Sequence, residues 1–93
     1  MEKVKAGDAK NKSLVKNILA REKLIISNSI AATESILKNF ESRYRMKSSS
    51  FFKKYVAGEM GDDTEVMMWA AQVRALEKLK ADLRKISGVK IVS

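Results

Sequence analysis

The chain has 93 residues, of which 45% are hydrophobic and 32% are charged, with a net charge of +8 and no proline. This length supports one small domain at most, and the absence of proline favours long uninterrupted helices, so we expect an all-α fold. Because the sequence has no cysteine and no histidine, it excludes disulfides, thiol and imidazole catalysis, and the usual zinc and copper sites.

Residues 1–12 are polar, contain Gly7 and show no hydrophobic periodicity, so we expect a mobile basic tail. They lack the apolar core of a signal peptide, and no later segment reaches the apolar length that a membrane span requires. We therefore expect a cytoplasmic protein without a membrane segment.

A first long helix is predicted over residues 13–45, with Ser13 as a candidate N-cap. Its apolar positions recur at steps of three and four residues, as on one helix face. The side chains of residues 27–29 can form hydrogen bonds with nearby backbone groups and so compete with the bonds of the helix. We interpret it as the exposed side of a continuous helix, with a break there as the alternative.

This helix would be about 48 Å long, which is too long for the remainder of so small a chain to cover. Its N-terminal apolar positions must pack against something else, which predicts a homodimer or a protein partner. The candidate partner-binding residues are Leu14, Ile18, Ile25 and Ile30.

Next come a short helix over residues 49–57, capped by a serine, and a last helix over residues 62–87 that Gly88 ends. Asp62 and Glu65 have the spacing of a capping box at the start of the last helix. We expect the long helices to form an antiparallel hairpin within one domain, residues 13–88, followed by a tail, 89–93.

The connection between the long helices, here called the elbow, is rich in aromatic residues and glycine. Its aromatic side chains are expected to fill the closed end of the hairpin, with a stacking platform for bases as the alternative. Adjacent Phe51 and Phe52 cannot face the same way on a helix. The elbow residues singled out are Phe40, Tyr44, Phe51, Phe52, Tyr55, Gly58, Gly61, Asp62 and Trp69.

Charge is unevenly distributed around the elbow. Six basic residues and one acidic residue lie within 38–58, whereas 59–65 contain four acids and no base. Candidate nucleic-acid contacts are Arg43, Arg45, Lys53 and Lys54, with solvated helix faces as the alternative. The acids suit helix capping better than a metal site, because their spacing does not match a calcium loop.

The elbow resembles that of small prokaryotic antitoxin-like proteins from toxin–antitoxin systems. In that family a long helix leads into a spaced aromatic pattern, a Phe helix, a Gly-Asp turn and a Trp. The matching positions are Phe40, Tyr44, Met46, Phe51 or Phe52, Gly58, Met60, Gly61, Asp62, Asp63 and Trp69. The chain departs from the pattern at Arg45, where the family usually has glycine, and at Val66, Met67 and Met68, where aromatic and acidic residues are expected.

The resemblance implies a non-catalytic protein that binds and neutralises a cognate toxin, plausibly of ribonuclease type. A basic nucleic-acid-binding protein is the second hypothesis, and a purely structural homo-oligomer is the third. The sequence contains no nucleophile elbow, no phosphate-binding loop and no base beside a serine. We therefore expect neither an enzyme nor a bound cofactor, metal or small-molecule substrate.

Overall fold

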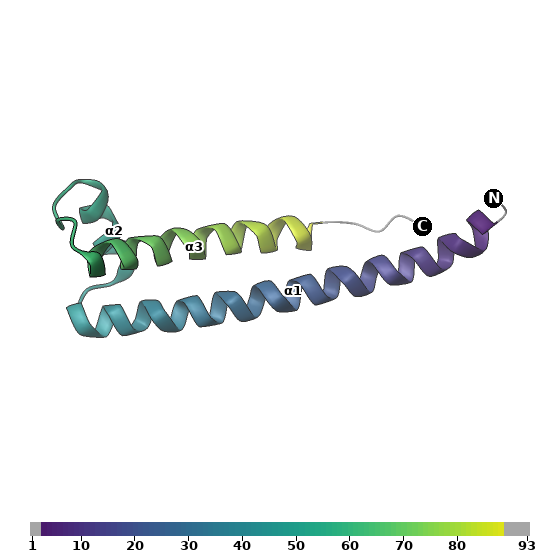
Figure 1. Ribbon diagram of the computed structural model, residues 1–93, viewed down its shortest axis with the longest axis horizontal. Helices are drawn as coiled ribbons and strands as arrows, with labels where there is room; N and C mark the ends of the chain where they lie inside the picture. The colour runs from purple at the N-terminus through teal and green to yellow at the C-terminus, as the bar shows by residue number, and fades with distance from the viewer. Residues whose placement is uncertain (1–2, 89–93) are drawn as a thin grey trace.

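The computed structural model describes the backbone of residues 3–88 and the side chains of residues 12–88. Within that range the chain forms three helices: α1 (Lys3–Tyr44), α2 (Ser48–Val56) and α3 (Thr64–Ser87). The long helices α1 and α3 lie antiparallel, and α2 packs at their closed end (Figure 1). The all-α hairpin is therefore confirmed. The expected tail over residues 89–93 lies outside the described residues.

Helix α1 begins ten residues earlier than predicted. It starts at Lys3, so the predicted helix start at residue 13 was too late. The sequence between these positions contains no proline, and most of its residues are good helix formers, so the helix continues past the single Gly7. The helix also runs unbroken through Ser27 to Ser29, which confirms the continuous interpretation.

Helices α1 and α2 end at their C-termini with the same backbone motif. At the end of α1 the Met46 N–H donates to the Glu41 carbonyl at 3.2 Å, and Arg45 adopts a positive φ of 52°. At the end of α2 the Glu59 N–H donates to the Lys54 carbonyl at 2.9 Å, with Gly58 at φ 79°. These are Schellman motifs, in which the residue after the C-cap is left-handed. Glycine adopts that conformation freely, whereas Arg45 does so with strain.

The start of α2 is capped by a residue distant in sequence. The Glu41 carboxylate on α1 accepts the Ser48 N–H at 2.9 Å, and Lys47 at the N-cap position makes no side-chain bond. Capping of α2 by a serine was therefore a wrong prediction. This bond lowers the pKa of Glu41 below its ordinary value, because the backbone N–H stabilises the charged carboxylate.

The start of α3 also differs from the prediction. Its N-cap is Asp63, whose carboxylate accepts the Val66 N–H at 2.9 Å. Asp62 is exposed and lies before the cap, so the predicted box of Asp62 with Glu65 does not form. Glu65 is held instead by side chains of α1, and Gly88 ends α3 as expected.

The hydrophobic core lies at the elbow and is centred on Trp69, which is fully buried. The Phe51 ring stacks on the indole at a centroid distance of 3.8 Å, and the Phe40 and Tyr44 rings stack at 5.4 and 5.2 Å. The indole Nε1–H donates to the Ser48 hydroxyl at 2.9 Å. The expectation that these aromatic residues form a core is confirmed.

The two neighbouring phenylalanines divide as helix geometry requires. Phe51 is fully buried, whereas Phe52 is half-buried and carries the Arg74 guanidinium 5.5 Å from its ring centroid. Tyr55 lies beside both rings and is approached by the same guanidinium at 5.8 Å. The Phe52 ring therefore lies at the edge of the core, with the Arg74 guanidinium over its face in a cation–π contact.

Candidate protein-interaction surface

The N-terminal half of α1 carries apolar side chains that remain exposed. Leu14, Val15 and Ile18 have exposed fractions of 56%, 41% and 52%. Their spacing places them on one side of the helix. We call these three residues the overhang stripe. Of the other predicted partner-binding residues, Ile25 is 51% exposed, and Ile30 is half-buried.

The register of the hairpin explains this exposure. The Tyr44 hydroxyl bonds Glu65, and the Lys80 ammonium lies 3.9 Å from the Glu34 carboxylate. Because both helices advance equally per residue, continuing this pairing places Ser87 beside roughly residue 25 of α1. Helix α1 continues beyond that level (Figure 1). The overhang stripe therefore lies past the last turn of α3.

The surface around the overhang stripe is hollowed and basic. Leu14, Asn17, Ile18 and Arg21 line a shallow depression on α1. Arg21 borders the stripe, whereas Lys16 and Lys23 lie on the opposite side of the helix, so residues 12–23 carry positive charge on more than one side. An exposed apolar stripe on a basic helix suits a complementary hydrophobic groove on an acidic partner.

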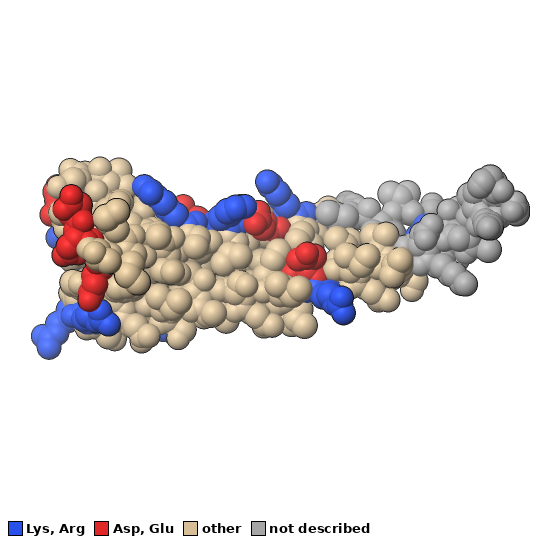
Figure 2. All heavy atoms as spheres, in the orientation of Figure 1, with Lys and Arg blue, Asp and Glu red and all other residues tan. Residues whose placement is uncertain are grey.

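The predicted nucleic-acid residues do not form a free basic surface. The Arg43 guanidinium donates to the Glu65 carboxylate at 2.8 Å and lies over the Phe40 ring at 5.7 Å. Arg45 is exposed at the end of α1, whereas Lys53 and Lys54 are exposed on α2. In the space-filling view, acidic side chains gather at the elbow end beside basic ones (Figure 2). The positive charge of the elbow is thus partly neutralised by its own acids.

Glu65 joins the two long helices through α1 side chains. The Tyr44 hydroxyl donates to its carboxylate at 2.6 Å, and the same oxygen accepts from Arg43. These bonds lower the pKa of Glu65 and raise the pKa of Tyr44, since each favours the charged carboxylate and the neutral phenol. The network fixes the register of the hairpin and leaves no free base at this position.

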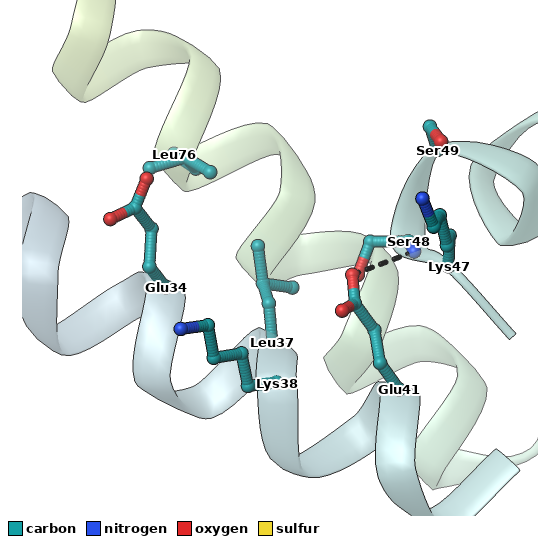
Figure 3. Close-up of a pocket in the computed structure, with 8 residues that line it drawn as sticks. All are labelled: Glu34, Leu37, Lys38, Glu41, Lys47, Ser48, Ser49 and Leu76. Atoms are coloured by element: carbon teal, nitrogen blue, oxygen red, sulfur yellow. Dashed lines mark hydrogen bonds between the residues drawn. The ribbon is translucent and has the colours of Figure 1, made fainter. Parts of the chain in front are cut away.

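A groove lies between α1, α2 and α3 and is lined largely by polar and charged residues. Charged residues of both signs line it, together with serines and two leucines (Figure 3). The Glu41 carboxylate points across it to the Ser48 N–H. Its best-placed carboxylate is therefore occupied as a helix cap. The lining residues are Glu34, Leu37, Lys38, Glu41, Lys47, Ser48, Ser49 and Leu76.

Sequence reasoning missed Glu41 and Ser48, although both organise the elbow. They lie seven residues apart across a helix end, a separation that no local capping pattern covers. Ser48 was considered only as a possible cap, whereas its hydroxyl binds the indole 21 residues away. Only a complete assignment of partners for the buried indole N–H could have indicated it.

Comparison of the chain with protein-family models, curated proteins and solved structures yields no match. Among residues 3–88, none of the helices has both the length and the apolar character needed to cross a membrane. Within the same range, no three acidic side chains gather closely enough to hold a metal ion. The function must therefore be inferred from the surfaces of the chain itself.

Proposed function

We propose that this protein is a non-catalytic, cytoplasmic interaction module that binds another protein through the N-terminal half of α1. The observation that carries the proposal is the overhang stripe, in which Leu14, Val15 and Ile18 are each about half exposed. Apolar side chains at such spacing are the anchors by which an amphipathic helix enters a hydrophobic groove.

The finer proposal is that the partner is a toxin, of the ribonuclease type that the elbow's resemblance implies, and that binding neutralises it. Burial of the three exposed portions contributes about 3 kcal/mol at the usual apolar coefficient. The net positive charge of residues 12–23 attracts an acidic partner, which adds to affinity and to the association rate. Burial and charge together favour an acidic protein partner.

The test is co-purification from the native host, with a matched pair of double variants. Leu14→Glu with Ile18→Glu places two charges in the overhang stripe. Ser13→Glu with Ala20→Glu places the same two charges on exposed positions of the same turns, away from the stripe. We expect the first variant to lose a stoichiometric protein partner that the wild type and the second variant retain at high salt.

Two further outcomes distinguish the alternatives. If the partner arrests growth when expressed alone, and co-expression of this chain restores growth, the antitoxin role is supported. Recovery of nucleic acid that dissociates with salt, and that is lost when Arg43, Arg45, Lys53 and Lys54 are all replaced by alanine, would overturn the proposal in favour of nucleic-acid binding.

A further inference from the structure

A second apolar surface lies on the hairpin itself and uses both long helices. On α1 it includes Ile25 and Ile36, which are 51% and 39% exposed, and on α3 it begins at Met68, which is 54% exposed. Steps of three and four residues continue it along α3 through half-buried Leu79, Leu83 and Ile86. We call these six residues the two-helix face. Arg21 and Glu22 separate it from the overhang stripe.

The centre of the two-helix face is free of charge. In the space-filling view, uncharged surface extends along both helices, while charged side chains gather at the elbow end and along the outer edges (Figure 2). Between Met68 and Ile86, the positions of α3 on this side are occupied by apolar residues and Gln72, with Asp82 at the edge, where it pairs with Lys78. In a chain of net charge +8, this is the side on which two copies can approach with little repulsion between like charges.

The dimensions of the face fit a second copy of the same hairpin. The stretch of α3 from Met68 to Ile86 spans about 28 Å, and two helices side by side present a width of about 20 Å. The resulting surface of about 560 Å² per copy, or about 1,100 Å² for the pair, exceeds the roughly 1,000 Å² in total that a specific interface buries. Small residues on the face, Ala32 and Ala75, permit close approach of facing helices.

The small extent of the core within one chain also favours pairing with a second hairpin. Among residues 12–88, its buried apolar residues are Leu37, Phe40, Phe51, Val66, Trp69 and Ala70, which all lie at or near the elbow. The open half of the hairpin is therefore a single layer of two helices, because α2 packs only at the closed end (Figure 1). A domain requires at least two packed layers, and a second hairpin supplies the missing one.

We infer that two copies pair through the two-helix face, antiparallel to one another, as a four-helix bundle. The charges at the two ends select this orientation. Exposed Glu59, Asp62 and Asp63 lie at the elbow, and exposed Arg84 and Lys85 lie in the last turn of α3. Antiparallel pairing sets these three acids of one copy beside the basic last turn of α3 in the other. It also leaves both overhang stripes projecting from the bundle.

The first test measures mass in solution by light scattering for a matched pair of variants. Ile36→Glu places a charge in the face, and Ser35→Glu places the same charge on the neighbouring exposed position at the outer edge. We expect twice the monomer mass for the wild type and for Ser35→Glu, and the monomer mass for Ile36→Glu. A monomeric wild type, or an Ile36→Glu variant that stays dimeric, would overturn the inference.

The second test does not depend on a destabilising change. Because the chain has no cysteine, single cysteines report proximity between copies without background. Antiparallel pairing through this face sets α3 of one copy against α3 of the other, so Met68 of one copy lies near Ile86 of the other. We expect an oxidised mixture of Met68→Cys and Ile86→Cys to form a mixed disulfide dimer, while neither variant alone does so. Disulfide formation by each variant alone, with no mixed product, would refute the antiparallel arrangement.

Discussion

Replacement of Ser48 by alanine tests the polar contact at the centre of the elbow core. The Ser48 hydroxyl accepts the Trp69 Nε1–H at 2.9 Å, and both residues are buried, with exposed fractions of 8% and 0%. Without the hydroxyl, the indole N–H is left buried and unpaired, which costs about 1–3 kcal/mol. Alanine is the better helix former by about 0.5 kcal/mol, which offsets a small part of the loss.

The expected loss is large for this chain. Native domains are stable by about 0.05–0.15 kcal/mol per residue, which corresponds to roughly 5–14 kcal/mol here. A decrease of about 2 kcal/mol lowers the ratio of folded to unfolded molecules roughly 30-fold at 25 °C. Urea unfolding measures it, because Trp69 is the only tryptophan and its fluorescence reports the core directly. Protein concentration is held constant, since association would change apparent stability.

Two comparisons isolate the contact. Ser49→Ala removes a hydroxyl from the next, exposed position, and we expect a change within about 0.5 kcal/mol. In a Trp69→Phe background the N–H is absent, so Ser48→Ala should cost much less there when unfolding is followed by circular dichroism. An equal cost in both backgrounds, or a cost no greater than that of Ser49→Ala, would refute the assignment.

Two further predictions concern the helix ends of the elbow. Arg45→Gly should raise the free energy of unfolding by about 0.5–1 kcal/mol, because a left-handed backbone costs an L-residue more than glycine loses in unfolded-state entropy. Denaturant titration measures this change. As the converse control, Gly58→Ala should lower the free energy of unfolding. Glu41→Gln should lower stability by about 1 kcal/mol at neutral pH through the weakened cap of α2. Since the pKa of Glu41 is lowered from 4.5 in the folded state, its contribution is complete above that value and disappears as pH falls below it. Unfolding curves of the two proteins should therefore converge in acid, and a constant difference down to low pH would contradict the cap.

The sequence predicted those parts of the fold that depend on periodicity and on strong local signals. The apolar spacing around Phe40, Tyr44 and Trp69 indicated the antiparallel hairpin, and the adjacency of Phe51 and Phe52 indicated that one ring would be buried and the other partly exposed. These features follow from helix geometry alone. They did not require knowledge of any distant contact.

The errors occurred where a tertiary partner competes with a local pattern. Asp62 and Glu65 have the spacing of a capping box, but Tyr44 and Arg43 bind the Glu65 carboxylate, and Asp63 caps α3 instead. Likewise, Glu41 replaces the expected serine cap of α2 from across the elbow. In both cases a side chain seven or more residues away decided the outcome, which no reading of neighbouring residues can supply.

The candidate interaction surface was predicted more closely than the caps, for a physical reason. An apolar stripe longer than the chain can cover is a property of sequence length and periodicity, so Leu14 and Ile18 could be named in advance. The division into an overhang stripe and a two-helix face could not, because it depends on where α3 ends relative to α1. The position along α1 at which α3 ends follows from the register of the hairpin, which the bond between Tyr44 and Glu65 sets.

The concentration of the core at the elbow determines the order in which the chain folds. Contacts at the closed end join residues about twenty positions apart, such as Trp69 with Ser48 at a separation of 21. The separation grows by two for every step toward the open end, and closing a longer loop costs more entropy. We therefore expect folding to start at the elbow and to proceed toward the open end, so that substitutions near Leu83 or Ile86 accelerate unfolding and leave the folding rate nearly unchanged.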